Sequence, residues 1–458
     1  MGGEIALNCL LNMGSVPANG EPRLVYLLVD VRPGEAAQPL QTPVNLGVVV
    51  DVSESMRLPV LNQDQFEELK RLGQVQETVS DGVAVWTFKS IPEHIRQQAP
   101  SNLEAVQTAI ADSTSHLEAH DRVSLVAFAE RAQPVLSGLP GTERQRVMES
   151  MASLGSLTLG DGTDMATGLA VGITEMRRNS AAGMLNRLLI LTDGFTRDPA
   201  RVHNMASEAR GTGIAISTLG IGSEFNEKLL VDLADASLGN AYFARVPQEI
   251  PPAFGEELAA VQSIIMRDVE IEVSFSAGVE MRRAYRVRPS ISMARDAARD
   301  GRKVTTRMGD LDPLTPPALL VELIVPTRTA GNFRIARVSV AHPSGQGGQE
   351  VAAAADVVLN YTTSSRRVEP NPVVMNTVEK VTAYTLQTRA LDDAASGDVA
   401  GATRKLRAAA TRLLTMGEVA LAQAAEEEAV RLEQSGEVSP EGAKELSYAT
   451  RKLTQRLS

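Results

Sequence analysis

The chain has 458 residues and a net charge of -11, with 3% aromatic residues. This length predicts two or three domains. The acidic balance and few aromatics argue against binding to nucleic acid or anionic lipid. The lone cysteine, Cys9, excludes an internal disulfide and a thiolate metal cage. Because the chain lacks a signal-peptide pattern and any apolar run of roughly 20 residues, we expect a cytoplasmic protein with no membrane span.

Residues 1–44 show the pattern of β-strands, in which Leu24–Val31 is a dense apolar run. Residues 45–265 alternate between fully apolar strands and amphipathic helices. Strands that are apolar throughout are buried on both faces, which is typical of an α/β domain with a doubly wound, mostly parallel sheet. The predicted strands are Asn45–Val50, Arg122–Phe128, Leu188–Thr192, Ile214–Gly220 and Ala241–Ala244, and the predicted helices are Leu103–Leu117, Glu143–Leu154, Met165–Met176, Arg201–Arg210 and Glu227–Ala236.

The segment 57–100 separates the first α/β strand from its expected helix by an unusually long stretch. Within it, Gln74–Thr78 and Val83–Phe88 flank Ser80-Asp81-Gly82, which predicts a β-hairpin. Long insertions in α/β domains are often functional lids. A decorative insertion without a role in binding remains an equal alternative.

Residues 266–366 return to a β pattern, with Val269, Ile271, Val273 and Phe275 alternating with polar residues. Residues 367–458 have helical spacing, and Gly397, Gly417 and Gly436 mark turns between helices. We therefore expect a C-terminal α-helical region of three or four helices, arranged as hairpins or a bundle.

The informative motif is Asp51-Val52-Ser53-Glu54-Ser55, directly after the first α/β strand. Thr163 lies just before a predicted helix, and Asp193 ends another buried strand. In an open parallel sheet, ligands bind at the carboxyl ends of the strands. Carboxylates and hydroxyls are hard oxygen donors, which suit Mg²⁺, with Mn²⁺ or Ca²⁺ as alternatives. Such residues also favour helix caps and turns, so each piece alone has a purely structural explanation.

With all three pieces present in order, residues 45–265 resemble a von Willebrand factor A (VWA) domain, and the motif resembles its metal-ion-dependent adhesion site (MIDAS). The resemblance implies that Asp51, Ser53, Ser55 and Thr163 coordinate the ion, and that Asp193 does so directly or through a water. It further implies that a partner's Asp or Glu completes the coordination. The family usually has Gly where this chain has Glu54.

The flanking segments resemble bacterial VWA proteins of the calcium-activated chloride channel homologue type. This implies a discontinuous β-sandwich of residues 1–44 and 266–366, from which the VWA domain of residues 45–265 emerges. The insertion 57–100 departs from the family, and residues 367–458 form the helical region. Related proteins often act beside MoxR-type AAA+ ATPases as adaptors or assembly factors.

The leading hypothesis is a non-enzymatic, metal-dependent protein-protein interaction module. One alternative is a self-assembling structural protein. A metal-dependent hydrolase, using bound water near Asp161 and Asp164, lacks an obvious general base. His116 and His120 have i, i+4 spacing without a zinc motif, so we expect surface histidines.

Overall fold

The computed structural model describes residues 5–35, 37–40, 42–80, 83–160, 162–196, 198–344, 348–364 and 369–455. The chain divides into two compact units. The first consists of Met1–Gln41, Leu238–Asn240 and Ala259–Ser458, and the second of Thr42–Ser237 and Ala241–Leu258. Asp81 and Gly82 of the predicted hairpin turn, and Asp161 before the predicted ligand Thr163, lie outside the described residues.

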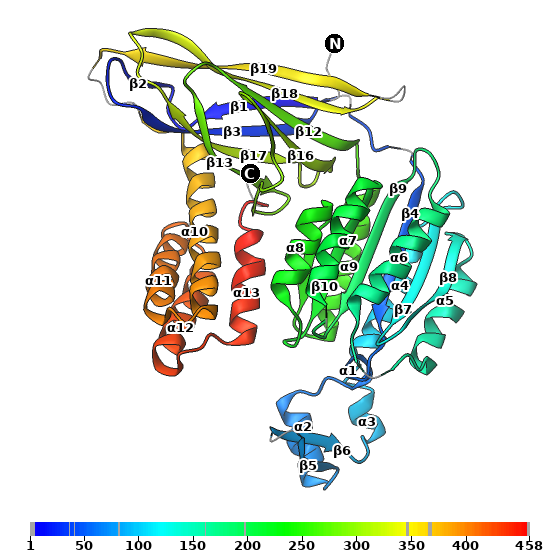
Figure 1. Ribbon diagram of the computed structural model, residues 1–458. Helices are drawn as coiled ribbons and strands as arrows, with labels where there is room; N and C mark the ends of the chain where they lie inside the picture. The colour runs from blue at the N-terminus through cyan, green and yellow to red at the C-terminus, as the bar shows by residue number, and fades with distance from the viewer. Residues whose placement is uncertain are drawn as a thin grey trace. The chain divides into compact units, whose positions relative to one another are not determined.

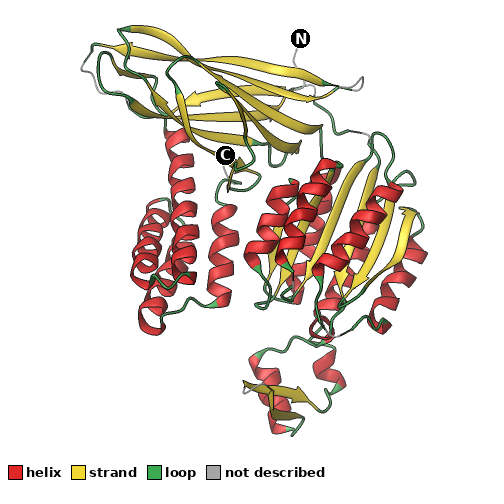
Figure 2. Cartoon of the chain, in the orientation of Figure 1, coloured by secondary structure: helices red, strands yellow, loops and turns green. Residues whose placement is uncertain are grey.

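The second unit is built on a six-stranded sheet in the order β11-β10-β9-β4-β7-β8. All neighbours in this sheet are parallel except β7 and β8, which are antiparallel. Helices line the strands (Figures 1 and 2), so central strand β4 is buried along its whole length. The strands are β4 (Val44–Asp51), β7 (Arg122–Phe128), β8 (Ala132–Pro140), β9 (Leu185–Thr192), β10 (Ile214–Ile221) and β11 (Ala241–Ala244).

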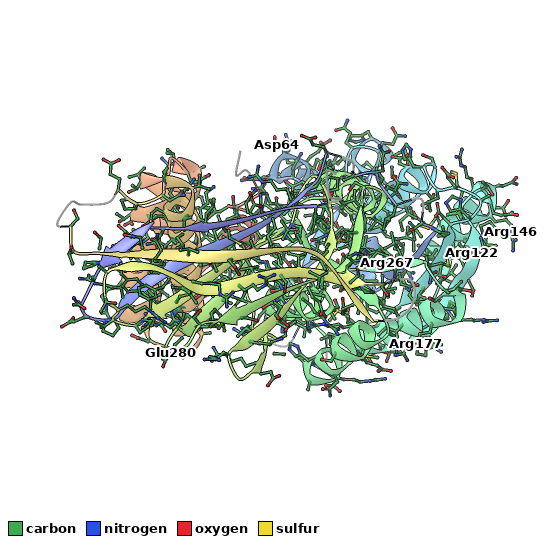
Figure 3. All side chains as sticks on the ribbon, turned by 90° about the horizontal axis from the view of Figure 1, so that it is seen from above. Asp64, Arg122, Arg146, Arg177, Arg267 and Glu280 are labelled. Carbon is green, nitrogen blue, oxygen red and sulfur yellow. The ribbon has the colours of Figure 1, made fainter. Side chains whose placement is uncertain are left out.

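Several helices of this unit begin at a polar side chain that caps them. Asp164 and Asp198 each accept a hydrogen bond from the backbone three residues later, at the starts of α6 and α7. Arg146 and Arg177, labelled in Figure 3, are exposed charges of this unit. The helices are α1 (Glu54–Arg57), α4 (Asn102–Thr114), α5 (Arg144–Ser153), η1 (Leu154–Ser156), α6 (Met165–Asn179), α7 (Pro199–Gly211), α8 (Glu227–Ser237), η2 (Pro247–Glu249) and α9 (Ile250–Gln262).

Helix α6 packs closely against β4, and glycines at two positions leave room for this contact. A Cβ atom added to Gly47 would lie 2.5 Å from the Sδ of Met176, and one added to Gly172 would lie 2.6 Å from Val49. Neither distance is compatible with a real side chain, so both positions require glycine as the structure stands. This close packing fixes the start of α6 beside the end of β4.

The insertion between β4 and α4 forms a small substructure of two helices and a hairpin, visible in Figure 1. Strand β5 (Val75–Ser80) pairs antiparallel with β6 (Val83–Phe88), as the sequence predicts. A reciprocal capping box starts helix α2 (Gln63–Arg71): Asn62 Oδ1 accepts from the Gln65 amide at 2.9 Å. The last element is the short helix α3 (Glu93–Arg96).

The first unit contains two sheets that enclose one hydrophobic core. One is antiparallel, in the order β1-β3-β17-β13-β14, and the other has the order β15-β16-β12-β18-β19-β2. The strands are β1 (Ile5–Leu11), β2 (Ser15–Pro17), β3 (Arg23–Pro33), β12 (Met266–Phe275), β13 (Glu280–Arg288), β14 (Ser292–Met293), β15 (Ala298–Asp300), β16 (Lys303–Leu311), β17 (Ala318–Val325), β18 (Gly331–Pro343) and β19 (Gln349–Thr362).

Strands β3 and β17 are apolar on both faces because each face packs against something different. Val29 of β3 and Leu319 of β17 face the core between the two sheets. Their neighbours Leu28 and Leu320 belong to a second core, shared with the C-terminal helices. Since successive side chains of a strand point to opposite faces, this double burial explains the dense apolar run that the sequence shows in β3.

Residues 369–455, the described part of the C-terminal region, form four helices connected by short turns: α10 (Pro372–Ala395), α11 (Val399–Thr415), α12 (Val419–Ser435) and α13 (Pro440–Arg451). Gly397, Gly417 and Gly436 stand at the turns with φ of 86°, 84° and 78°. L-residues with side chains rarely adopt this left-handed conformation, which accounts for glycine at all three predicted turns. Among the described residues, no helix is both long and apolar enough to cross a membrane.

The core between the sheet and the helices predicts that two leucines of α11 contribute very differently to the free energy of unfolding. Leu406 is 0% exposed, whereas Leu414 is 59% exposed. Leu406→Ala is expected to lower the free energy of unfolding by about 2–5 kcal/mol, because it leaves a cavity. Leu414→Ala, the matched control, is expected to stay within about 0.5 kcal/mol of the wild type. Urea denaturation of both variants measures the difference, and equal effects would contradict this packing.

Candidate metal centre

The motif residues lie at the carboxyl edge of the central strands. Asp51 is the last residue of β4, and Asp193 follows Thr192, the last residue of β9. These strands are parallel neighbours, with Val50 opposite Leu191, so their ends meet. Ser53 precedes helix α1 directly. The sheet topology therefore brings together side chains that are about 140 positions apart in the sequence.

A continuous hydrogen-bond network joins both carboxylates to the motif hydroxyls. Asp51 Oδ1 accepts from the Ser53 amide at 2.9 Å, and Asp51 Oδ2 accepts from the Thr192 hydroxyl at 2.7 Å. Ser55 Oγ donates to Asp193 Oδ1 at 2.8 Å. The network thus contains four of the five predicted ligands, Asp51, Ser53, Ser55 and Asp193.

The distance between the two serine hydroxyls fits a shared ion. Ser53 Oγ and Ser55 Oγ lie 3.2 Å apart. Adjacent ligands of an octahedral Mg²⁺, each about 2.1 Å from the metal, are about 3 Å apart. A Ser55 hydroxyl whose hydrogen points to Asp193 still has lone pairs for a cation. The donor set therefore fits a hard divalent ion.

Thr163 lies next to Asp51 and next to Gly194, the residue that follows Asp193. Burial raises the pKa of the Asp51 carboxyl, and a hydrogen bond from the Thr163 side chain offsets part of that rise. A Cβ atom on Gly194 would lie 2.7 Å from Thr163 Oγ1, so glycine after Asp193 leaves the space that Thr163 occupies. All five predicted ligands thus lie together, at or just after the ends of β4 and β9 and just before α6.

Both carboxylates are buried, and burial raises the pKa of each. Asp51 is 0% exposed and Asp193 is 8% exposed. For Asp193, desolvation and then the charge of Asp51 raise the pKa to about 6, against hydrogen bonds from Ser55 and Asn102. Desolvation likewise raises the pKa of Asp51. In the described part of the chain, neither carboxylate forms an ion pair with a Lys or Arg. Buried charges of one sign require a counter-charge, which a divalent cation can supply.

Two acidic residues near the site, Asp164 and Glu54, are not among the predicted ligands. Asp164 caps α6, since its carboxylate accepts from the amide and the hydroxyl of Thr167 at 3.1 and 2.8 Å. Glu54 is exposed in the first turn of α1. Across the described ranges, no group of three or more His, Cys, Asp or Glu could hold a metal. This argues against a zinc cage and leaves the hydroxyl-rich site as the candidate.

The predicted helix Leu103–Leu117 is shorter in the structure, where α4 ends at Thr114. His116 and His120 therefore lie beyond the helix rather than on one face of it. Ser115 is the residue that follows the helix, and the hydroxyls of Thr114 and Ser115 donate to backbone carbonyls of the last turn. The end of α4 at Thr114 removes the helical spacing that the two histidines have in the sequence.

Sequence reasoning missed two residues of this network, Thr192 and Asn102. Thr192 is 1% exposed and holds Asp51 from the neighbouring strand. Its position just before Asp193, at a strand end, is the signal that could have identified it. Asn102 Nδ2 donates to Asp193 Oδ2 at 3.3 Å. Nothing in the sequence indicates this contact, because the insertion separates Asn102 from the motif.

Two parts of the chain match known protein families. Residues 94–251 match the von Willebrand factor type A domain, and residues 372–456 match the Sll0103-like, C-terminal alpha-helical domain. The chain contains a VWA domain. The matched range begins near the end of the insertion, so β4 and the first three predicted ligands precede it.

Two relatives in sequence cover different shares of the chain. YfbK of Escherichia coli is 24% identical over 179 residues, which are 38% of this chain and 31% of YfbK. The sll0103 protein of Synechocystis is 24% identical over 361 residues, covering 77% of this chain and 84% of that protein. The similarity to sll0103 thus extends well beyond the VWA domain.

Two solved structures are similar over almost the whole chain. A von Willebrand factor type A protein from Catenulispora acidiphila has a TM-score of 0.74 at 17% identity and covers 98% of this chain and 97% of its own. The ArnB paralog VWA2 from Sulfolobus acidocaldarius has a TM-score of 0.54 at 14% identity, covering 98% and 99%. At these identities, the likeness establishes the fold.

The raised pKa of Asp193 predicts how stability depends on pH without metal. A carboxyl with a folded pKa of about 6, against 3.8 when unfolded, stabilises the fold fully below pH 3.8 and loses this contribution as pH rises through 6. The loss amounts to about 3 kcal/mol. Asp193→Asn lacks this titration. In EDTA, its stability relative to the wild type should therefore rise between pH 4 and pH 7, as urea denaturation measures. A difference that stays constant with pH would contradict the assignment.

Proposed function

We propose that this chain is a metal-dependent protein-protein interaction module that binds a partner carboxylate through Mg²⁺. Asp51, Ser53, Ser55 and Thr163 would coordinate the ion, and Asp193 would do so directly or through a water. The observation that carries the proposal is the burial of Asp51 and Asp193 beside hydroxyls at ligand spacing, with no Lys or Arg paired to either in the described chain. Mn²⁺ and Ca²⁺ are alternative ions for the same donors.

The ion would have room for one outside ligand. Mg²⁺ prefers six oxygen ligands and usually keeps some waters, so the four side chains leave coordination positions open. A partner's Asp or Glu would take one of them. Glu54, exposed beside the two serines, adds negative charge where the partner would approach. We propose that Glu54 disfavours partners whose acidic residue lies within a larger acidic cluster.

Exposed apolar side chains near the site would supply the rest of the contact. Phe195, two residues after Asp193, is 63% exposed, and Leu58, three residues after Ser55, is 46% exposed. A metal–carboxylate bond alone gives little selectivity among acidic proteins, whereas buried aromatic anchors contribute much of the affinity in many interfaces. The proposed partner therefore presents an acidic residue next to an apolar one.

The family resemblance extends this proposal to the location, the partner and the domain arrangement of the chain. The chain would act in the cytoplasm of a bacterium, as a protein of the calcium-activated chloride channel homologue type without channel activity. It would work as an adaptor or assembly factor alongside a MoxR-type AAA+ ATPase. Its two-sheet unit would correspond to the β-sandwich of that type, with domain limits near residues 45 and 265.

Metal binding is tested by titrating the purified chain with Mg²⁺ in a calorimeter. The wild type should release or absorb heat with a single site. The double variant Asp51→Ala, Ser53→Ala should bind at least about 100-fold more weakly, because changes to residues outside the ligand set already cost 10–100-fold. An absence of binding in the wild type would refute the proposed function.

The partner is tested by affinity capture from native cell extract with Mg²⁺, using the wild type and the same double variant. A partner that depends on the metal should be recovered by the wild type alone. Phe195→Ala should bind Mg²⁺ like the wild type and recover about tenfold less partner, in keeping with a truncated interface anchor. Equal recovery by all three proteins would show that the metal is not the point of attachment.

The two alternatives give different results in the same preparations. A self-assembling structural protein would change its mass in light scattering when Mg²⁺ is added, because one copy would fill the site of another. A metal-dependent hydrolase would turn over phosphoesters with Mg²⁺ and lose this activity in Asp51→Ala. The proposed interaction module predicts a constant mass and no turnover.

A further inference from the structure

We infer that Asn102 is a positioning residue of the metal centre, one that sets the orientation of the Asp193 carboxylate. This inference rests on the proposed function. Asn102 is the first residue of α4 and is buried. Its side-chain Nδ2 donates to Asp193 Oδ2 at 3.3 Å, across 91 positions of the sequence. Asn102 does not itself supply an atom to the proposed coordination.

The contact fixes Asp193 because it complements the bond from Ser55. Ser55 Oγ donates to Oδ1, whereas Asn102 donates to Oδ2, so each oxygen of the carboxylate has its own donor. A carboxylate held at both oxygens cannot rotate freely about its last bond. Asp193 then keeps the orientation in which it reaches the ion or the ion's water. Groups that orient metal ligands in this way tune metal affinity strongly.

Asn102 lies at the point where the insertion ends and α4 begins. Ser101 caps α4: its hydroxyl accepts from the Glu104 amide at 3.1 Å, and Glu104 accepts from the Ser101 amide at 2.8 Å. Pro59 forms a β-bridge with Ser101, and the Val60 amide donates to the Pro100 carbonyl at 3.3 Å. The two ends of the insertion are therefore joined next to Asn102.

This arrangement connects the insertion to the proposed metal ligands at both ends. On the entry side, the Leu58 amide donates to the carbonyl of Ser55 at 3.3 Å. On the exit side, Asn102 contacts Asp193 one residue after Ser101. The joined segment at Pro59 and Ser101 is held by backbone groups, so it does not depend on the Ser101 hydroxyl. Asn102 therefore links the end of the insertion to Asp193 through a single side-chain hydrogen bond.

The experiment compares Asn102→Ala with Ser101→Ala in the full chain, by calorimetric titration with MgCl₂ and by thermal unfolding in EDTA. Asn102→Ala should weaken Mg²⁺ binding by about 10-fold or more. Ser101→Ala is the matched control, since it removes the cap of the same helix without touching Asp193. It should lower the unfolding temperature yet keep the Mg²⁺ affinity within about twofold.

Asn102→Ser provides a second variant in case Asn102→Ala unfolds in EDTA. Serine is polar and compatible with the first turn of a helix, but it is too short to reach Asp193. It should also weaken Mg²⁺ binding. Wild-type affinity in a folded Asn102 variant would overturn the inference and leave the proposed function standing. Equal weakening by Ser101→Ala would also overturn it, because the effect would then come from the helix start. Failure of the wild type to bind Mg²⁺ would instead refute the proposed function.

Discussion

Two carboxylates removed from water at the ends of adjacent parallel strands impose the main constraint on this molecule. The buried, closely packed sheet brings Asp51 and Asp193 together and also denies them solvent. Their pKa values rise for that reason, and hydroxyl and amide donors offset only part of the cost. The close approach of α6 to β4, made possible by Gly47 and Gly172, brings the loop with Thr163 to the same edge. The fold therefore leaves two buried carboxylates whose desolvation cost is only partly offset, and a bound cation would stabilise their charged forms.

Much of the α/β unit could be predicted because its strands are apolar throughout. Burial on both faces leaves a strong signal, and β7 has the predicted bounds Arg122–Phe128. The ligand candidates could be predicted because the carboxyl ends of parallel strands converge. The edge strand β8 was not predicted, since only one of its residues is buried and its pattern is mixed. Its antiparallel pairing with β7 depends on contacts that the sequence pattern does not record.

The site residues that could not be predicted are held by contacts between segments far apart in the sequence. Asn102 meets Asp193 only because the insertion closes on itself at Pro59 and Ser101, and no spacing rule predicts this closure. Thr192 acts on Asp51 across the strand pair, so its role depends on register rather than on local sequence. The Asp164 carboxylate, which the hydrolase hypothesis placed near a metal-bound water, caps α6. A polar residue at a helix start can serve either role, and only its neighbours decide which.

The two-faced strands β3 and β17 have a consequence for how the chain folds. Residues 372–456 match a domain of their own, yet the helices share a core with Leu28 and Leu320 on the outer face of a sheet. Removing the helices would expose this apolar face to water, which favours aggregation. Sheets and helices should therefore unfold in one cooperative transition. The family match to residues 372–456 would then mark a segment that recurs in other proteins but does not unfold independently in this one.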